Sequence, residues 1–134
     1  MKTNSFYPVI MTNEIKKCSR FFIKHFDFTT TFEADWYISL IDDNNNELAF
    51  LDYTHETIPS GFGQLQNGLL LNFEVDNVDK HYARLKKDLQ NKIKLDIKSE
   101  SFGQRHFIIE APGKVLVDVI QVIEASDEYK LNYE

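Results

Sequence analysis

Apolar residues recur at two spacings along the chain, and these spacings predict its helices and strands. In one segment, lysines and an arginine separate the apolar positions, which is typical of an amphipathic helix. These apolar positions are Ile15, Cys18, Phe21, Phe22 and Phe26. Thr12 and Asn13 stand just before them as capping residues. The apolar and β-branched run Phe6–Met11, which precedes this cap, predicts a buried strand.

Three more strands are expected in the first half of the chain. Phe28–Phe32 is rich in Thr and Phe, and a turn-forming run of Asp and Asn separates Trp36–Ile41 from Leu48–Tyr53. From Thr54 to Asn67 the Pro, Gly, His and Asn residues break every period, which indicates a loop. Loops of this length in small domains are usually functional or mobile.

The second half of the chain repeats the order of the first. Leu69–Val75 predicts a strand, and Val78–Leu89 predicts a helix capped by Asp76 and Asn77. Three strands follow, expected at Ile93–Ile97, Arg105–Ile109 and Val115–Ile123. Each half of the chain is therefore predicted to be one βαβββ module.

The repeat predicts an α+β fold made of two βαβββ modules in tandem. When Thr12 is placed over Val75, Asn13 falls on Asp76 and Ile15 falls on Val78, so the helices are in phase. Neither module is large enough to bury a good core alone, so we expect their sheets to form a curved mixed sheet around a concave cleft. The chain would then be a single domain over residues 1–134, with modules at about 5–53 and 68–123, a linker at 54–67 and a C-terminal tail at 124–134.

The composition narrows the classes of function. The 134 residues include 21 carboxylates against 15 lysines and arginines, a net charge of −6, so we expect no nucleic-acid partner. Eleven Phe, six Tyr and one Trp suit a large core and can also line a ligand cavity. The single cysteine, Cys18, excludes an internal disulfide framework and a cysteine-based zinc site. The sequence shows neither a signal-peptide pattern nor an apolar stretch of about 20 residues, so we expect a soluble, cytoplasmic protein without a membrane partner.

Three stretches of the sequence carry a resemblance to a known superfamily. They are YPVIMTNEIKKCSRFFIKHFDF, LLLNFEVDNVDKHYARL and FGQRHFIIEAPGKVLVDVIQ. Together they resemble the vicinal oxygen chelate superfamily, which contains glyoxalases, bleomycin-resistance proteins and extradiol dioxygenases. The resemblance runs from Phe6 to about Val122. It implies a paired βαβββ fold, a homodimer and a concave sheet that holds a small molecule.

Enzymes of this superfamily hold a divalent metal through residues of three strands, and some add a carboxylate from a fourth. The resemblance places Tyr7, a residue near Leu70, and Asp118 at the three usual positions, while the fourth strand offers only residues 48–51, Leu-Ala-Phe-Leu. Leucine cannot ligate a metal, and a tyrosine with a pKa near 10 is a rare ligand for such a site. We therefore expect no metal of this kind and no other cofactor.

The expected ligand-binding residues bring rings and a negative charge to the cleft. They are Tyr7, Trp36, Tyr37, Phe50, Phe102, His106 and Asp118. Asp118 lies between Val117 and Val119, so the two-residue period of a strand turns its side chain away from the helix. The alternatives are that Asp118 is a paired structural aspartate and that Trp36 packs against a helix.

Arg105 and His106 are adjacent in an expected strand, so at most one of them reaches the cleft. An arginine there would favour an anionic ligand. We expect a structural or rim position for Arg105, but the sequence leaves open which of the two residues faces the cleft.

Without the metal, the chain resembles the bleomycin-resistance proteins of the superfamily, which sequester a cationic drug without modifying it. The predicted function is therefore to bind a small molecule, with a cationic drug-like ligand as the specific form. One alternative is a lyase, isomerase or dioxygenase that holds a metal through non-standard ligands, or that transfers a proton through Asp118 without a metal. Another alternative is an interaction or structural role in which the cleft is vestigial.

Overall fold

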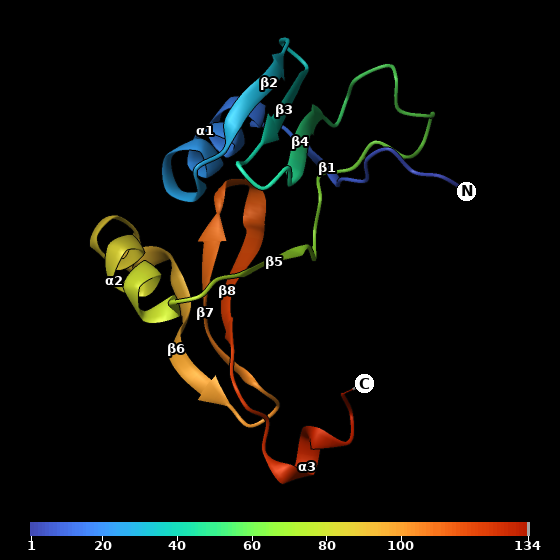
Figure 1. The fold of residues 1–134 in the computed structure, drawn as a ribbon. Coiled ribbons are helices and arrows are strands. Elements are labelled where there is room, and N and C mark those ends of the chain that lie inside the picture. Colours follow the sequence, from blue (N-terminus) through green and yellow to red (C-terminus); the bar gives the residue numbers. More distant parts are fainter. Residues whose placement is uncertain (134) are drawn as a thin grey trace. The chain divides into compact units, whose positions relative to one another are not determined.

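The first module is a four-stranded sheet with one helix on it (Figure 1). The computed structural model describes residues 1–133 of the chain. The elements of this module are β1 (Val9–Thr12), α1 (Ile15–Phe26), β2 (Thr29–Glu33), β3 (Tyr37–Ile41) and β4 (Glu47–Asp52). The strand order is β1-β4-β3-β2, in which β1 runs parallel to β4 and the other neighbours are antiparallel.

The second module has the same architecture. Its strands and its main helix are β5 (Leu70–Glu74), α2 (Val78–Leu89), β6 (Ile93–Glu100), β7 (Gln104–Ala111) and β8 (Val115–Val122). Short helical segments are η1 (Gln90–Lys92), η2 (Pro112–Lys114) and α3 (Asp127–Lys130). The strand order β5-β8-β7-β6, with β5 parallel to β8, repeats that of the first sheet. The predicted α+β fold of two βαβββ modules is confirmed, while the arrangement of both sheets around a cleft stays a prediction.

The contacts divide the chain into two compact units. Unit 1 contains Met1–Asn67 and the turn Pro112–Lys114, and unit 2 contains Gly68–Ala111 and the chain from Val115 onward. The turn packs against α1 of unit 1, where the Cys18 thiol donates a hydrogen bond to the Pro112 carbonyl at 3.5 Å. The loop expected at 54–67 joins β4 to the strand that opens unit 2.

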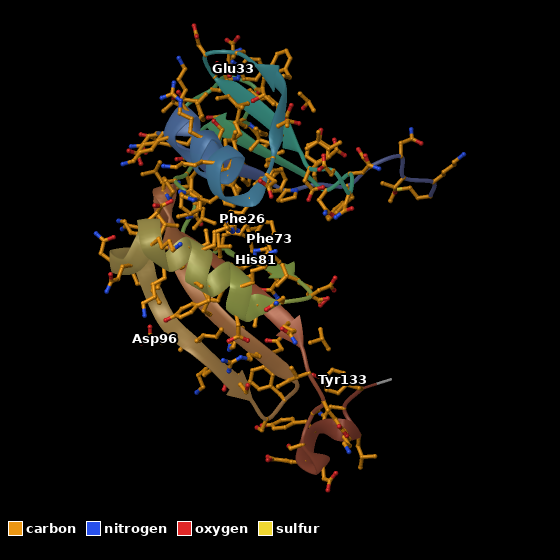
Figure 2. All side chains as sticks on the ribbon, turned by 60° about the vertical axis from the view of Figure 1, so that its left-hand side comes forward. Phe26, Glu33, Phe73, His81, Asp96 and Tyr133 are labelled. Atoms are coloured by element: carbon orange, nitrogen blue, oxygen red, sulfur yellow. The ribbon has the colours of Figure 1, made fainter. Side chains whose placement is uncertain are left out.

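Each helix covers one face of its own sheet, and that layer holds most of the buried apolar side chains. In unit 1, Phe22 of α1 lies 5.7 Å from Phe50 of β4, ring centre to ring centre. In unit 2, Tyr82 of α2 meets Phe107 of β7 edge-on at 5.0 Å. Figure 2 shows the side chains of these layers on the ribbon. We call the sheet face away from the helix the open face of each module.

Only α2 begins with the cap that the sequence predicted. The Asn77 side chain accepts a hydrogen bond from the Lys80 N–H at 3.1 Å, which is the predicted cap of α2. The N-cap of α1 is Glu14, which makes no side-chain cap hydrogen bond, instead of the predicted Thr12 or Asn13; the Thr12 hydroxyl accepts a hydrogen bond from the Glu14 N–H at 3.2 Å, ahead of the helix. No helix among residues 1–133 is long and apolar enough to cross a membrane.

The first strand is shorter at its start than the sequence predicted. It begins at Val9 rather than Phe6, and Phe6 is 92% exposed. Pro8 explains the difference because it has no N–H to donate to a neighbouring strand. Only its carbonyl takes part, accepting a hydrogen bond from the Ala49 N–H.

Candidate functional site

Asp118 lies on the open face of the second module. It is opposite Asn72 of β5 and Ile108 of β7, while its neighbours Val117 and Val119 turn toward α2 and are fully buried. This is the orientation that strand alternation predicted. Asp118 is itself 5% exposed, so its charge needs a partner close by.

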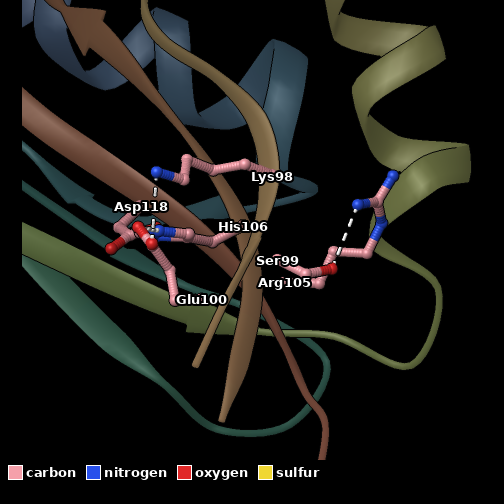
Figure 3. Close-up of polar contacts among 6 residues, drawn as sticks. All are labelled: Lys98, Ser99, Glu100, Arg105, His106 and Asp118. Atoms are coloured by element: carbon pink, nitrogen blue, oxygen red, sulfur yellow. Dashed lines mark hydrogen bonds and ion pairs between the residues drawn. The ribbon is translucent and has the colours of Figure 1, made fainter. Parts of the chain in front are cut away.

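Arg105 and His106 point to opposite faces of β7. The Arg105 guanidinium donates two hydrogen bonds to Asp79 of α2, from Nε at 3.1 Å and from Nη2 at 2.8 Å. It also donates to the Ser99 hydroxyl at 3.2 Å (Figure 3). Arg105 therefore faces the helix, and His106 faces the open side.

The partner of Asp118 is His106. Its Nδ1 lies 2.8 Å from Oδ1 of Asp118, and its Nε2 lies 2.8 Å from Oε2 of Glu100, the last residue of β6. Lys98, two residues earlier on β6, places Nζ 3.3 Å from Oε1 of Glu100. Figure 3 shows these four side chains on the same side of the sheet, and we call them the His106 cluster.

The hydrogen bonds of the cluster set its charge. Carboxylates only accept hydrogen bonds, so a ring that bonds two of them must carry a proton on both nitrogens. Burial lowers the pKa of His106, but the hydrogen bonds with Glu100 and Asp118 outweigh it, and the net pKa lies above 6.5. The bond from His106 lowers the pKa of Glu100. The cluster therefore holds an imidazolium and an ammonium against two carboxylates.

Phe102 covers the edge of the cluster. Its ring meets that of His106 edge-on, with centres 6.3 Å apart, and it is 37% exposed. Gly103 forms the turn after it with φ of +110°, and a Cβ there would come within 3.2 Å of the Ile123 carbonyl oxygen. Tyr133 donates a hydrogen bond to the Phe102 carbonyl. The chain after β8 therefore helps to hold this turn in place.

The first module carries a second group of candidate residues, which we call the ring cluster. It consists of Tyr7, Phe32, Trp36, Tyr37 and His55. Trp36 and His55 stack nearly in parallel, with centres 3.9 Å apart and planes 9° from each other. Tyr37 touches both Phe32 and Trp36. Tyr37 projects from the open face, because the helix-facing residues of β3 are its neighbours Ile38 and Leu40.

The surroundings of Tyr37 raise the pKa of its hydroxyl. Burial raises its pKa most, and the charge and hydrogen bond of Tyr7 raise it further. Glu47 also raises this pKa, as the last of the causes; in the register of β3 on β4 it lies opposite Ile41, at the other end of β3 from Tyr37. Tyr7 is 38% exposed and Phe32 is 51% exposed, which leaves ring surface available for contact.

Phe50 is the one expected site residue that the structure places in a helix-packed core. It is fully buried, and it packs on Phe22 of α1 instead of projecting from the open face. The sequence did not reveal this because Ala49 and Leu51, on the other face of β4, are apolar and buried too. A strand buried on both faces has no polar alternation to mark its orientation.

Four residues of the two clusters were not expected from the sequence. Lys98 and Glu100 were missed because the sixth strand was predicted to end at Ile97, whereas it continues to Glu100. Alternation along the longer strand would have placed both residues beside His106. Phe32 was treated only as a strand residue, and His55 only as a loop residue.

The residues present do not fit the metal site that the superfamily's enzymes use. Within residues 1–133, no group of three or more His, Cys, Asp or Glu side chains is arranged to hold a metal ion. In the His106 cluster the two carboxylates bond opposite nitrogens of one ring, so the three side chains do not converge on a point. Leu70 of β5 is apolar, and Asp118 is already bonded to His106.

No family model matches the chain, and no curated protein matches it by sequence.

Comparison of the structure finds the same fold in solved proteins. A glyoxalase/bleomycin resistance protein/dioxygenase family enzyme from Burkholderia phytofirmans PsJN aligns with a TM-score of 0.73 and 18% identity, over 87% of this chain and 97% of that one. A glyoxalase/bleomycin resistance protein/dioxygenase from Nocardioides gives 0.74 and 12%, over 92% and 86%. A lactoylglutathione lyase from Agrobacterium tumefaciens gives 0.70 and 12%, over 90% and 94%. The chain therefore has the fold of the glyoxalase/bleomycin resistance/dioxygenase superfamily.

Proposed function

We propose that this chain is a small-molecule binding protein of the glyoxalase/bleomycin resistance/dioxygenase superfamily. The observation that carries the proposal is the ring cluster on the first module, where five rings gather from three parts of the chain. Rings that contact one another and keep exposed surface are suited to stack on a flat or cationic ligand.

The structure around these rings supports binding more directly than it supports metal chemistry. The positions expected for the superfamily's metal ligands include one near Leu70, which itself cannot ligate, and Asp118, which is already paired. A ligand held by stacking needs no metal. The proposal therefore places the chain among the members of the superfamily that lack the usual metal site.

A cationic drug-like ligand is the specific form of this proposal. The net charge of −6 favours the approach of a cationic ligand, and the ring cluster offers it aromatic faces. A cation over the face of Trp36 or Tyr37 gains about 0.5–2 kcal/mol. Asp118, which we expected to supply the negative charge, is compensated by His106, so the preference for a cation rests on the net charge and on the rings.

A fluorescence titration tests this proposal, because Trp36 is the only tryptophan. We expect bleomycin-type and other cationic aromatic compounds to change the emission of Trp36 saturably and to raise the melting temperature. In Trp36→Leu, the same thermal shift should require at least five times the ligand concentration. Phe50→Leu, a change in the core, is the matched control and should leave it unchanged. A library of such compounds that stabilises neither protein would refute the proposal.

A second candidate function is enzymatic, and the buried pair of His106 and Asp118 favours it. A carboxylate on Nδ1 orients an imidazole, and the Nε2–H of His106, which bonds Glu100 in this structure, can act as a general acid once Glu100 has moved away. We propose an isomerase or lyase of the superfamily as this alternative. Two measurements separate the candidates: a tightly held transition metal at one per chain, or turnover that His106→Gln abolishes, would favour the enzyme over the binding protein.

We also propose that the chain forms a homodimer and acts without nucleic acid. The proposal rests on the superfamily's usual assembly and on the acidic net charge. Light scattering after size exclusion gives the mass directly. A monomer at physiological concentration would contradict the dimer.

A further inference from the structure

Glu100 binds a different cationic group with each oxygen of its carboxylate. Its Oε2 is 2.8 Å from Nε2 of His106, and its Oε1 is 3.3 Å from Nζ of Lys98 (Figure 3). Charge-assisted bonds to both oxygens are the means by which proteins hold the carboxylate of a ligand. In this structure the carboxylate that accepts from both donors is that of Glu100, a residue of the same module.

The deeper donor is fixed in position. His106 is 5% exposed, its Nδ1 is bonded to Asp118, and Phe102 lies edge-on to its ring. The Nε2–H of His106 therefore keeps its direction whether or not Glu100 is in place. A donor that is oriented in advance binds a ligand at a lower entropic cost.

The side chains of Lys98 and Glu100, in contrast to that of His106, lie where they can move. The Lys98 side chain is 53% exposed, and the Glu100 side chain is 21% exposed. Glu100 is the last residue of β6, directly before the turn that leads to β7. Its side chain can leave His106 toward solvent without opening the apolar layer beneath α2, since that layer lies on the other face of the sheet.

We propose that Nε2 of His106 and Nζ of Lys98 form a binding site for the carboxylate of a small organic acid, and that Glu100 occupies this site until the ligand displaces it. The site lies within unit 2 and uses none of the residues of the ring cluster. Its failure and the failure of the proposed function are therefore separate results.

The site can be tested by removing its occupant. Glu100→Ala deletes one methylene and the carboxylate, which correspond in size to an acetate ion. We expect acetate to bind this variant saturably, with a shift of the His106 ring-proton signal and a rise in melting temperature. The signal is assigned as the one missing from His106→Gln, since the chain has four histidines.

The same acetate titration is made on the wild type, in which Glu100 is still present. Its own Glu100 competes as an intramolecular ligand, so acetate should bind about ten- to thirtyfold more weakly than to Glu100→Ala. The same His106 signal should still move at high acetate. A wild type that does not respond at a hundred times the acetate dissociation constant of the variant would overturn displacement of Glu100 by a ligand.

Two controls separate a site from a general effect of charge. Glu110 is also paired with a lysine, Lys94 at 3.5 Å, so Glu110→Ala removes an equivalent carboxylate whose cationic partner is a lysine and not a histidine. It should gain no acetate binding. Chloride at equal ionic strength should not reproduce the acetate response in Glu100→Ala. Equal responses to chloride, or an equal gain in Glu110→Ala, would overturn the proposal.

Lys98→Met in the Glu100→Ala background should weaken acetate binding at least threefold, because one of the two donors is lost. If Glu100→Ala proves poorly folded by circular dichroism, the same titration is made on Glu100→Ser, which removes the same carboxylate and keeps a small polar side chain. The absence of saturable acetate binding in the folded variant would refute the site.

Discussion

Asp118 and His106 are diagonal neighbours across β8 and β7, and their side chains meet at 2.8 Å. The residue directly opposite His106 is Ile120, and the residue directly opposite Asp118 is Ile108. Diagonal neighbours on one face of an antiparallel pair are within reach of each other only through long or ring-bearing side chains. The contact between Asp118 and His106 is therefore a buried polar contact beside the apolar residues Ile108 and Ile120. Its loss should lower the free energy of unfolding.

Asp118→Asn tests that cost. The amide keeps an oxygen that can accept from Nδ1, but the charge that balances the imidazolium is lost. We expect the free energy of unfolding, measured in urea near pH 6, to fall by about 2 kcal/mol. Glu74→Gln, an exposed change on β5, is the control and should stay within about 0.5 kcal/mol of the wild type. An equal effect of the two changes would mean that Asp118 is not the partner that stabilises His106.

The same cluster predicts how stability depends on pH. The pKa of His106 is raised above 6.5 in the folded state, so its contribution is complete below pH 6.5 and is lost as pH rises through the folded value. The pKa of Glu100 is lowered from 4.5, so its contribution is present above pH 4.5 and is lost on acidification. Stability should therefore be greatest between these limits.

Urea unfolding at pH 5.5 and pH 9 measures the alkaline side of this dependence. The wild type should be less stable at pH 9, and His106→Gln should lose most of the difference because the titrating ring is gone. A wild type whose stability increases over this range would contradict the raised pKa. His81→Gln, at a half-buried position of α2 that hydrogen-bonds Arg84 and lies outside the His106 cluster, should keep the wild-type dependence.

Phe50 provides a test of the core of unit 1. Phe50→Leu leaves a gap against Phe22, and we expect a loss of about 1–2 kcal/mol in the free energy of unfolding. Phe32→Leu, at a position that is 51% exposed, should cost less than about 0.5 kcal/mol. The emission spectrum of Trp36 should remain unchanged in Phe50→Leu. A changed spectrum would place Phe50 in the ring cluster after all.

His55 controls the surroundings of Trp36 through their parallel stack. His55→Ala removes the imidazole from one face of the indole, so we expect the emission maximum to move to longer wavelength as water reaches the ring. His81→Ala serves as the control and should leave the spectrum unchanged. If His55→Ala also leaves it unchanged, the loop at 54–67 does not rest on Trp36 in solution.

The fold was more predictable than the site, for reasons that particular residues illustrate. The helical spacing of Cys18 and Phe22 and the capping residue Asn77 are local signals, and they located both helices within the correct modules. Asp118 is a single polar residue between valines, so the local sequence also predicted the sheet face on which it lies. The sheet face of Phe50 could not be predicted in this way, because both sides of β4 are apolar.

The His106 cluster depends on contacts between strands that no local pattern records. Its formation requires the register of β6 on β7, which pairs Lys98 with His106, and an extension of β6 to Glu100. Irregular pairing along β6 shifts that register twice. Arg105 was assigned to the helix side only once its bonds to Asp79 were known.

The strand order has a consequence for how each module opens. In both sheets two strands lie between two neighbours, and of these the last strand of the module, β4 or β8, carries more buried positions than β3 or β7. Opening such a strand breaks two ladders of hydrogen bonds at once, whereas β2 or β6 gives up one. The amide hydrogens of β4 and β8 should therefore exchange with deuterium most slowly, and the C-terminal strand of each module becomes its most persistent part.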